Sequence, residues 1–378
     1  METTLEVPQG VFELTRNTAH TPEALRAWDA ADEYLLHHLA EEELLVEGVR
    51  ILILNDNFGT LTVALNKYAP VAISDSYLSQ QVTRSNLISN ELSNENIQLH
   101  SIMSFTQESF DLVLIKVPKT LALLEYELIK LSENISPSTR VILAGMLKVL
   151  PRSIWKICER ILGPTTTSLA KKKSRLIFIS PDEDIEIPEN PYPVCYQLEN
   201  TSYEICNHAN VFSRDSLDIG TRFFLKHIPS NMSANHIIDL GCGNGVVGLI
   251  AAERNKYSKL FFVDESFMAL ASAEQNFSTA FSNTREAEFY AADGLVDFES
   301  DSTDLILCNP PFHQQQTVGD HISQKMFKES LRVLNKGGEL RVIGNRHLGY
   351  HVSLKRLFGN VEQLAVNAKF VILKSIKT

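Results

Sequence analysis

Several features that would indicate a membrane or secreted protein are missing from this chain of 378 residues. It has no run of about 18 apolar residues, so we expect no transmembrane helix. The opening METTLEVPQG has no basic segment followed by an apolar stretch, so we expect no signal peptide. No two cysteines form a C-x-x-C pair, so we expect neither a zinc site nor a disulfide framework and predict a protein of the reducing cytoplasm. The cysteines are Cys158, Cys195, Cys206, Cys242 and Cys308.

Positive charge is also scarce. The chain has 35 Lys and Arg against 46 Asp and Glu, a formal net charge of −11. This balance argues mildly against a nucleic-acid partner, although the placement of the basic groups matters more than their sum. The basic residues concentrate along 148–160 and at Lys171, Lys172, Lys173 and Arg175. Such a run is either a solvated face or a surface that contacts nucleic acid.

The most informative stretch is 236–248, HIIDLGCGNGVVG, which has the pattern of a strand, a glycine turn and a helix. Gly241 and Gly243 fill the first two positions of G-x-G-x-x-G, but Val246 stands at the third. Asp239 at the strand end would repel a pyrophosphate and suits a ligand with a cationic amino group. The alternative is a tight strand–helix turn of any α/β domain.

Three further strand ends carry polar groups in the same half of the chain. Asp264 ends an apolar strand, where such folds bind ribose hydroxyls, and Asp293 is placed to accept from an adenine amine. Leu305–Cys308 ends in Asn309-Pro310-Pro311-Phe312. Together these motifs resemble class I S-adenosylmethionine-dependent methyltransferases over roughly 207–374. The NPPF motif resembles the branch that methylates amino nitrogens of planar systems.

The residue types of NPPF suit this chemistry, because an amine on an aromatic ring is a poor nucleophile. The Asn309 Oδ1 and the Pro310 carbonyl can both accept its N–H groups and direct its lone pair toward the sulfonium methyl. Pro310 and Pro311 stiffen the turn, and Phe312 can stack on the base. Transfer then depends mainly on positioning, and no metal is needed. The alternative is a proline-rich turn after a strand.

The first half of the chain repeats this order of strands and helices. Aligning 50–54 with 236–240 places Ile53 opposite Asp239 and Asn55 opposite Gly241, and Lys116 through Lys119 fall opposite the NPPF motif. We therefore predict an α/β protein of two tandem Rossmann-like class I methyltransferase domains, with the N-terminal copy degenerate. The expected bounds are 1–180 and 194–378, joined by a linker over 181–193. The alternative is two unrelated α/β domains.

The full-length pattern is similar to the family of bacterial ribosomal RNA guanine-N2 methyltransferases, and most to those of the large subunit. The stretches that carry this resemblance are AWDAADEYLL, IKVPKTLALLE, GPTTTSLAKKKSRLI, NHANVFSRDSLDIGTRFF, CNPPFHQQ and GNRHL.

The resemblance implies methylation of the 2-amino group of one guanine in large-subunit (23S) rRNA, with S-adenosylmethionine as cofactor. It implies no membrane, metal or DNA partner. Cofactor contacts are expected at Asp239, Gly241, Gly243, Asp264, Asp293 and Asn309, and RNA contacts at Lys116, Lys119, Lys171, Lys172, Lys173 and Arg175. Alternatives are a small-subunit guanine, an adenine, a protein glutamine, or a non-catalytic RNA-binding assembly factor.

Overall fold

The computed structural model describes residues 2–16, 25–94, 97–105, 108–230, 234–282, 284–311 and 316–378, with the backbone alone over 316–320. The chain divides into two compact units, Met1–Pro191 and Tyr192–Thr378. The expected linker over 181–193 contains this division. Among the described residues, no helix combines the length and apolar character that a bilayer span requires.

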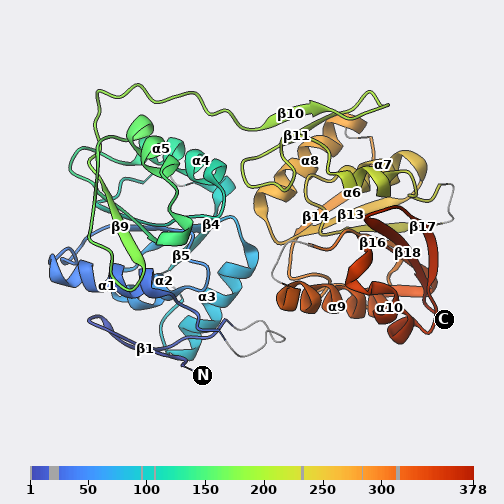
Figure 1. Cartoon of the computed structure of the whole chain (residues 1–378), viewed down its shortest axis with the longest axis horizontal. Coiled ribbons are helices and arrows are strands. Elements are labelled where there is room, and N and C mark those ends of the chain that lie inside the picture. Colours follow the sequence, from blue (N-terminus) through green and yellow to red (C-terminus); the bar gives the residue numbers. More distant parts are fainter. Residues whose placement is uncertain are drawn as a thin grey trace. The chain divides into compact units, whose positions relative to one another are not determined.

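The first unit is a seven-stranded sheet of order β5-β4-β3-β6-β7-β9-β8, preceded by the hairpin of β1 and β2 (Figure 1). Its elements are β1 (Thr4–Val7), β2 (Gly10–Glu13), α1 (Ala30–Glu41), β3 (Ile51–Leu54), α2 (Thr60–Ala64), β4 (Val71–Ser74), α3 (Tyr77–Ser89), β5 (Gln98–Ser101), β6 (Leu112–Lys116), α4 (Leu121–Leu131), β7 (Arg140–Met146), α5 (Ser153–Ile161), β8 (Thr165–Thr167) and β9 (Ser174–Ile179).

The second unit has a seven-stranded sheet of order β14-β13-β12-β15-β16-β18-β17, preceded by the hairpin of β10 and β11. Its elements are β10 (Val194–Gln197), β11 (Glu204–Asn207), α6 (Ile219–Leu225), β12 (His236–Leu240), α7 (Val246–Arg254), β13 (Lys259–Asp264), α8 (Phe267–Phe281), β14 (Ala287–Ala291), β15 (Thr303–Cys308), α9 (Gln316–Val333), β16 (Leu334–Asn345), α10 (Tyr350–Phe358), β17 (Glu362–Val366) and β18 (Phe370–Ile376).

The two sheets have the same topology, strand for strand. In each, the first five strands are parallel, and the last strand of the chain, β9 or β18, lies between the fifth and the sixth and runs antiparallel to both. Chance agreement of two unrelated α/β domains would not reproduce this order. The predicted fold class, a tandem repeat of Rossmann-like domains, is therefore confirmed.

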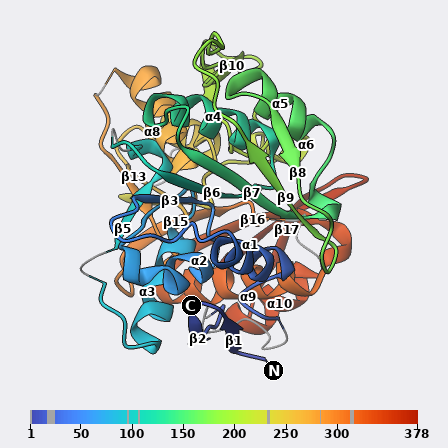
Figure 2. The ribbon, with the colours of Figure 1, turned by 90° about the vertical axis from the view of Figure 1, so that its left-hand side faces the viewer.

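Apolar cores cover both faces of each sheet, as the continuous apolar strands predict. In the second unit, one core lies between the sheet and α6, α7 and α8, with Phe224, Leu249 and Phe277 buried in it. The other core lies under α9 and α10, around Phe327 and Leu354. Figures 1 and 2 show the same division in the first unit, with α1, α2 and α3 on one face of the sheet and α4 and α5 on the other.

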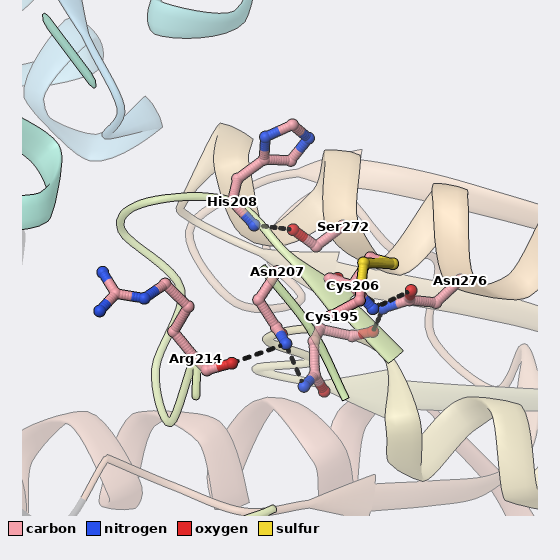
Figure 3. Close-up of a disulfide and its surroundings, with 8 residues drawn as sticks. Cys195, Cys206, Asn207, His208, Arg214, Ser272 and Asn276 are labelled. Carbon is pink, nitrogen blue, oxygen red and sulfur yellow. Dashed lines mark hydrogen bonds between the residues drawn. A yellow bond between two sulfur atoms is a disulfide. The ribbon is translucent and has the colours of Figure 1, made fainter. Parts of the chain in front are cut away.

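The expectation of no disulfide is wrong, because Cys195 and Cys206 are bonded to each other (Figure 3). The sequence separation of 11 residues hides their proximity: β10 and β11 form an antiparallel ladder in which these two positions lie directly opposite. The other three cysteines are free and buried. Burial raises the pKa of each of these thiols, that of Cys158 to about 12, so they act as core side chains and not as nucleophiles.

One buried acid in the first unit gives its stability an unusual pH dependence. Glu127 of α4 is 1% exposed, and its carboxyl accepts a 3.0 Å hydrogen bond from the Asn55 side chain. Burial raises the pKa of Glu127 to about 8, and the charge of Asp75 adds to the shift. The folded unit therefore retains a proton at this site that the unfolded chain releases near pH 4.5.

We predict that the unfolding free energy of the first unit falls between about pH 5 and 8, by up to about 1.4 kcal/mol per pH unit for this group, and that Glu127→Gln makes this slope clearly shallower. The stabilising contribution is complete below the unfolded pKa and is lost as the pH rises through the folded pKa. Urea unfolding followed by tryptophan fluorescence reports the first unit alone, since both tryptophans, Trp28 and Trp155, lie there. Glu133→Gln, at an exposed glutamate, is the control and should keep the wild-type slope. An unchanged slope in Glu127→Gln would contradict the assignment.

Candidate methyl-transfer site

The polar strand ends predicted from the sequence meet at one edge of the second sheet. Strands β14, β13, β12 and β15 are adjacent and parallel, so their carboxyl ends share that edge. Asp239 lies on β12, Asp264 ends β13, and Asp293 and Asn309 directly follow β14 and β15. Residues separated by up to 70 positions in the sequence are thereby brought to one site.

The glycine loop is held open by a close contact between β12 and α7. Gly241, Gly243 and Gly245 all have positive φ, of 70°, 53° and 76°. The Asp239 carboxylate accepts a 2.7 Å hydrogen bond from the Gly248 N–H in the first turn of α7. A Cβ at Gly248 would lie 2.3 Å from the ring of Phe262, whereas a Cβ at Gly243 would meet nothing within 4 Å. Gly248 thus serves packing, and Gly243 borders open space.

Two of the acids are already partly engaged by backbone. Asp264 accepts from the Gly243 N–H at 2.9 Å and from the Ser266 N–H at 3.0 Å, which fixes the loop relative to the strand. Burial raises the pKa of Asp264 and raises that of Asp239 to about 8. Neither carboxylate has a cationic side chain as an ion-pair partner among the described residues. A bound cationic group would lower both pKa values again.

Asp293 differs, because it forms an ion pair with Lys325 of α9. The Lys325 Nζ also donates to the Asp293 carbonyl at 3.3 Å and lies 3.7 Å from Glu329. The side chain of Asp293 remains 36% exposed, so one face of it is open to a ligand. Lys325 was not predicted from the sequence, since nothing in its local pattern marks it as a partner of Asp293.

Three asparagines that the sequence analysis missed, Asn207, Asn244 and Asn276, fix the glycine loop by hydrogen bonds; Figure 3 labels two of them, Asn207 and Asn276. Asn244 of the loop donates to the Asn207 side chain at 2.9 Å. Asn276 of α8 donates to the Asn244 carbonyl at 3.0 Å and exchanges two hydrogen bonds with the backbone of Cys206. The hairpin of β10 and β11 is thereby tied to the loop. A helical position 32 residues away gives no local sequence signal for this contact.

The amide of Asn309 has one end engaged and one end free. Its Nδ2 donates to the Thr221 hydroxyl at 3.1 Å. Its Oδ1 is buried and has no hydrogen-bond partner within the part of the chain that the structure describes. An unpaired buried amide oxygen is costly and needs an explanation, such as a ligand donor. Pro310 is buried and Pro311 is exposed, and Phe312 lies outside the described residues.

A second amide oxygen with the same property lies on the neighbouring strand. The Oδ1 of Asn345, at the end of β16, is also buried without a partner among the described residues. β15 and β16 are parallel and adjacent, with Cys308 opposite Val342. Side chains alternate along a strand, so Asn309 and Asn345 point to the same face as Leu307 and Ile343. The sequence analysis did not identify Asn345 as a site residue.

The residues present fit S-adenosylmethionine. Gly243 leaves room for a ligand to approach the loop, and the acids at three adjacent strand ends suit its ammonium, ribose and adenine groups. The free Asn309 Oδ1 supplies an acceptor at the fourth strand end. Asp239, Asp264 and Asp293 would hold this cofactor, with the backbone of Gly241 and Gly243.

The equivalent edge of the first unit has lost these features. Asn55 takes the positive-φ position of Gly241, with φ of 63°, and Gly59 matches Gly245. The strand registers place Ser74 where Asp264 stands, so the first unit also lacks the carboxylate that is expected to bind ribose hydroxyls. Thr62, equivalent to Gly248, donates its N–H to Asp56 at 2.8 Å. Burial raises the pKa of Asp56 to about 6. An acid still binds this N–H, but from the loop and not from the strand.

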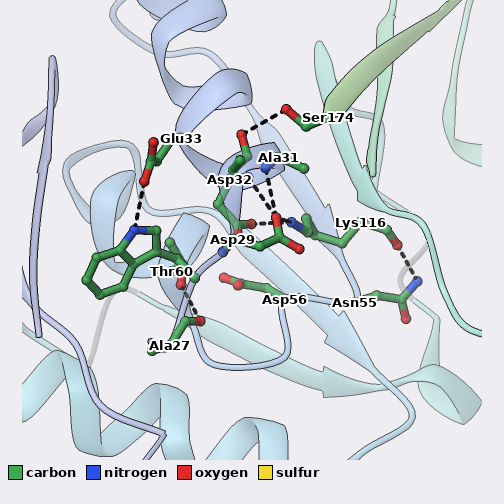
Figure 4. Close-up of polar contacts among 12 residues, drawn as sticks. Ala27, Asp29, Ala31, Asp32, Glu33, Asn55, Asp56, Thr60, Lys116 and Ser174 are labelled. Atoms are coloured by element: carbon green, nitrogen blue, oxygen red, sulfur yellow. Dashed lines mark hydrogen bonds and ion pairs between the residues drawn. The ribbon is translucent and has the colours of Figure 1, made fainter. Parts of the chain in front are cut away.

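Lys116 stands in the first unit where Asn309 stands in the second, and its charge is paired with two carboxylates (Figure 4). Its Nζ lies 3.0 Å from Asp29 and 2.6 Å from Asp32, and its side chain is 12% exposed. The side chain expected to contact RNA is thus held in an ion pair with two acids of the same unit. Strand-end position alone could not reveal the carboxylates, which lie 84 or more residues earlier. Lys119 is exposed.

The lysine run forms the exposed turn between β8 and β9. Lys171 lies 3.7 Å from Glu41, and Lys172 lies 2.7 Å from Glu33. Lys173 is exposed, and Arg175 is only partly buried. Acidic neighbours on α1 therefore partly neutralise the run while leaving its side chains open to solvent.

Comparisons with known proteins cover the whole chain. Residues 2–183 match the family described as "RLMG N-terminal domain", and residues 202–374 match "Methyltransferase small domain". A protein of Stutzerimonas stutzeri named "Ribosomal RNA large subunit methyltransferase G" is 47% identical over 374 residues, 99% of each chain. A protein of the same name from Pseudomonas fluorescens is 46% identical over 374 residues, again 99% of each chain.

A solved structure shares the fold of both units. It is the T. thermophilus 16S rRNA N2 G1207 methyltransferase RsmC in complex with AdoMet and guanosine, with a TM-score of 0.76 and 19% sequence identity. The match covers 100% of this chain and 98% of that one. At this identity the likeness shows the fold alone.

We predict that Gly243→Ala weakens S-adenosylmethionine binding at least about tenfold while the melting temperature changes little. The new Cβ would enter the space beside the loop, and the backbone strain of φ 53° costs only about 1 kcal/mol. Gly248→Ala is the contrasting variant: its Cβ would press on Phe262 and should destabilise the fold by about 1–3 kcal/mol, so its melting temperature should fall as well. Calorimetry should find one site in the full chain. Two equal sites would contradict the degenerate first copy.

Proposed function

Since the chain belongs to the family of Ribosomal RNA large subunit methyltransferase G, we propose that it methylates the exocyclic 2-amino group of a guanine in large-subunit (23S) rRNA. S-adenosylmethionine is the methyl donor. The observation that carries this proposal is the unpaired Asn309 Oδ1 at the end of β15, beside a loop and acids that fit the cofactor.

For methyl transfer to the amine, the protein needs only to position the reactants and to accept hydrogen bonds from the amine. When bound, the cofactor would supply a methyl group on a sulfonium sulfur: an N–C bond to the amine lone pair would form in line with the C–S bond that breaks, the thioether would leave, and one amine proton would be released. The Asn309 Oδ1 and the Pro310 carbonyl accept the two N–H groups of the amine and so withdraw its lone pair from the ring. Burial of this Oδ1 makes each such hydrogen bond stronger than it would be in water. The four strand ends hold the methyl donor and the amine in fixed positions relative to each other.

The second free amide oxygen favours guanine over adenine. Guanine presents two neighbouring donors on its Watson–Crick edge, N1–H and the 2-amino group, whereas adenine has an acceptor at N1 beside its amine. Asn345 Oδ1 and Asn309 Oδ1 are both acceptors on the same face of adjacent strands. Such a pair complements guanine, and one of its members would repel the N1 lone pair of adenine.

The first unit and the lysine turn would contribute RNA contacts. Lys171, Lys172, Lys173 and Arg175, together with Lys119, carry the positive charge that a phosphate backbone needs within an acidic chain. This substrate places the enzyme in the cytoplasm and involves no membrane, metal or DNA.

We predict that Asn309→Ala lowers the single-turnover rate of guanine N2 methylation at least about 100-fold, because the amine loses its acceptor, while cofactor affinity stays within about twofold. Nucleoside analysis by mass spectrometry of 23S rRNA from a strain lacking this protein measures the product. Asn335→Ala removes an amide that bonds Asp304 at the opposite end of the sheet, at 2.7 Å, and should leave the rate unchanged. If Asn309→Ala lost methylation rate and cofactor affinity to the same extent, the amide would have a structural role only.

Charge reversal of Lys171, Lys172 and Lys173 to Glu is expected to weaken RNA binding and to reduce the slope of log affinity against log salt by roughly two to three. A matched variant reverses Lys67, Lys256 and Lys336, three exposed lysines that are far apart in the sequence. It changes the net charge equally and should have a clearly smaller effect on binding and slope. Equal effects of the two variants would mean that Lys171, Lys172 and Lys173 are only a solvated surface and make no specific RNA contact.

A further inference from the structure

We propose that Thr221 is a positioning residue for the methyl transfer: its hydroxyl, directed by Asp218, fixes which end of the Asn309 amide faces the substrate. This inference rests on the proposed function and assigns the residues that orient its acceptor. Thr221 lies in the first turn of α6, 88 residues before Asn309 in the sequence.

The direction of the hydrogen bonds carries the first step. Asp218 caps α6: its Oδ2 accepts from the Thr221 N–H at 2.8 Å and lies 3.3 Å from the Thr221 Oγ1. A carboxylate oxygen can only accept, so the hydroxyl proton points to Asp218. The lone pairs of Oγ1 then face Asn309 and can accept only from its Nδ2, at 3.1 Å.

The second step follows from the shape of an amide. Its NH₂ and its oxygen lie at opposite ends, and rotation by 180° exchanges them at little steric cost. With Nδ2 held by Thr221, the oxygen is the end left free, and it is the buried Oδ1 without a partner among the described residues. If the amide turned over, it would present two donors to an amine that itself needs acceptors.

The first unit supplies independent support, because it contains the same contact with different chemistry (Figure 4). Asp29 caps α1 as Asp218 caps α6, and Asp32 stands three residues after its cap, as Thr221 does. Asp32 contacts Lys116, the counterpart of Asn309, at 2.6 Å. Both copies thus join the third residue of this helix to the end of the same strand.

The difference between the copies shows what the threonine provides. In the first unit an ion pair joins Lys116 to Asp29 and Asp32, so the charged group at that strand end is engaged by the protein itself. In the second unit a neutral hydroxyl holds one end of a neutral amide and leaves the other end open. The second arrangement orients a group for a ligand, whereas the first closes the site.

The test compares Thr221→Val with Thr221→Ser in the full chain. Valine keeps the shape but loses the hydroxyl, so the single-turnover rate on 23S rRNA should fall about 10- to 100-fold, with the dissociation constants for S-adenosylmethionine and RNA within about twofold of wild type. Serine keeps the hydroxyl and should restore most of the rate. Thr303→Val is the control, since it removes another buried hydroxyl bond, to the His236 carbonyl, at the opposite end of β15. It should lower the melting temperature and leave the rate per folded molecule unchanged.

Three outcomes would overturn the assignment. Thr221→Val could retain the wild-type rate, it could lose cofactor binding in proportion to the rate, or Thr221→Ser could be as slow as Thr221→Val. Failure of the proposed function is a separate result, recognised by a wild-type protein that binds the cofactor but forms no N2-methylguanine in this RNA.

Discussion

The whole site depends on how closely α7 approaches β12. The hydrogen bond from the Gly248 N–H to Asp239 is possible only because Gly248 has no side chain to collide with Phe262. That approach sets the path of the loop, whose three positive-φ glycines leave room beside Gly243. The Gly243 N–H in turn fixes Asp264. This arrangement has an energetic cost, because Asp239 is buried without a cation beside it and its pKa is raised to about 8.

The two halves of the chain show what happens when that constraint is released. Thr62 stands where Gly248 would be, and the acid that binds its N–H moves from the strand to Asp56 in the loop. The helix start is preserved, since its N–H still has a partner, but the acid on the strand is not. Ser74 and Lys116 complete the change at the two neighbouring strands. The fold survives because its apolar strands and its helix caps do not depend on the ligand.

Much of this could be predicted from the sequence, because strands that are apolar throughout and end in an acid or an NPP turn are local patterns. The duplication, the cofactor loop and the placement of Asp239, Asp264, Asp293 and Asn309 at one edge all follow from such patterns. The partners of these residues do not. Thr221, Lys325 and Asn276 act across 32 to 88 positions. The ion pair of Lys116 likewise joins distant segments, and the disulfide depends on the register of a hairpin that the sequence does not fix.

The ion pair that closes the first unit has an evolutionary consequence. Restoring an amide at position 116 by a single substitution would leave Asp29 and Asp32 without their counter-ion, one of them buried, and breaking such a pair costs roughly 3–5 kcal/mol. Replacing the two acids first would instead leave Lys116 without a counter-ion. Each of these single substitutions thus passes through a destabilised protein, so the residues at positions 29, 32 and 116 are constrained to change together.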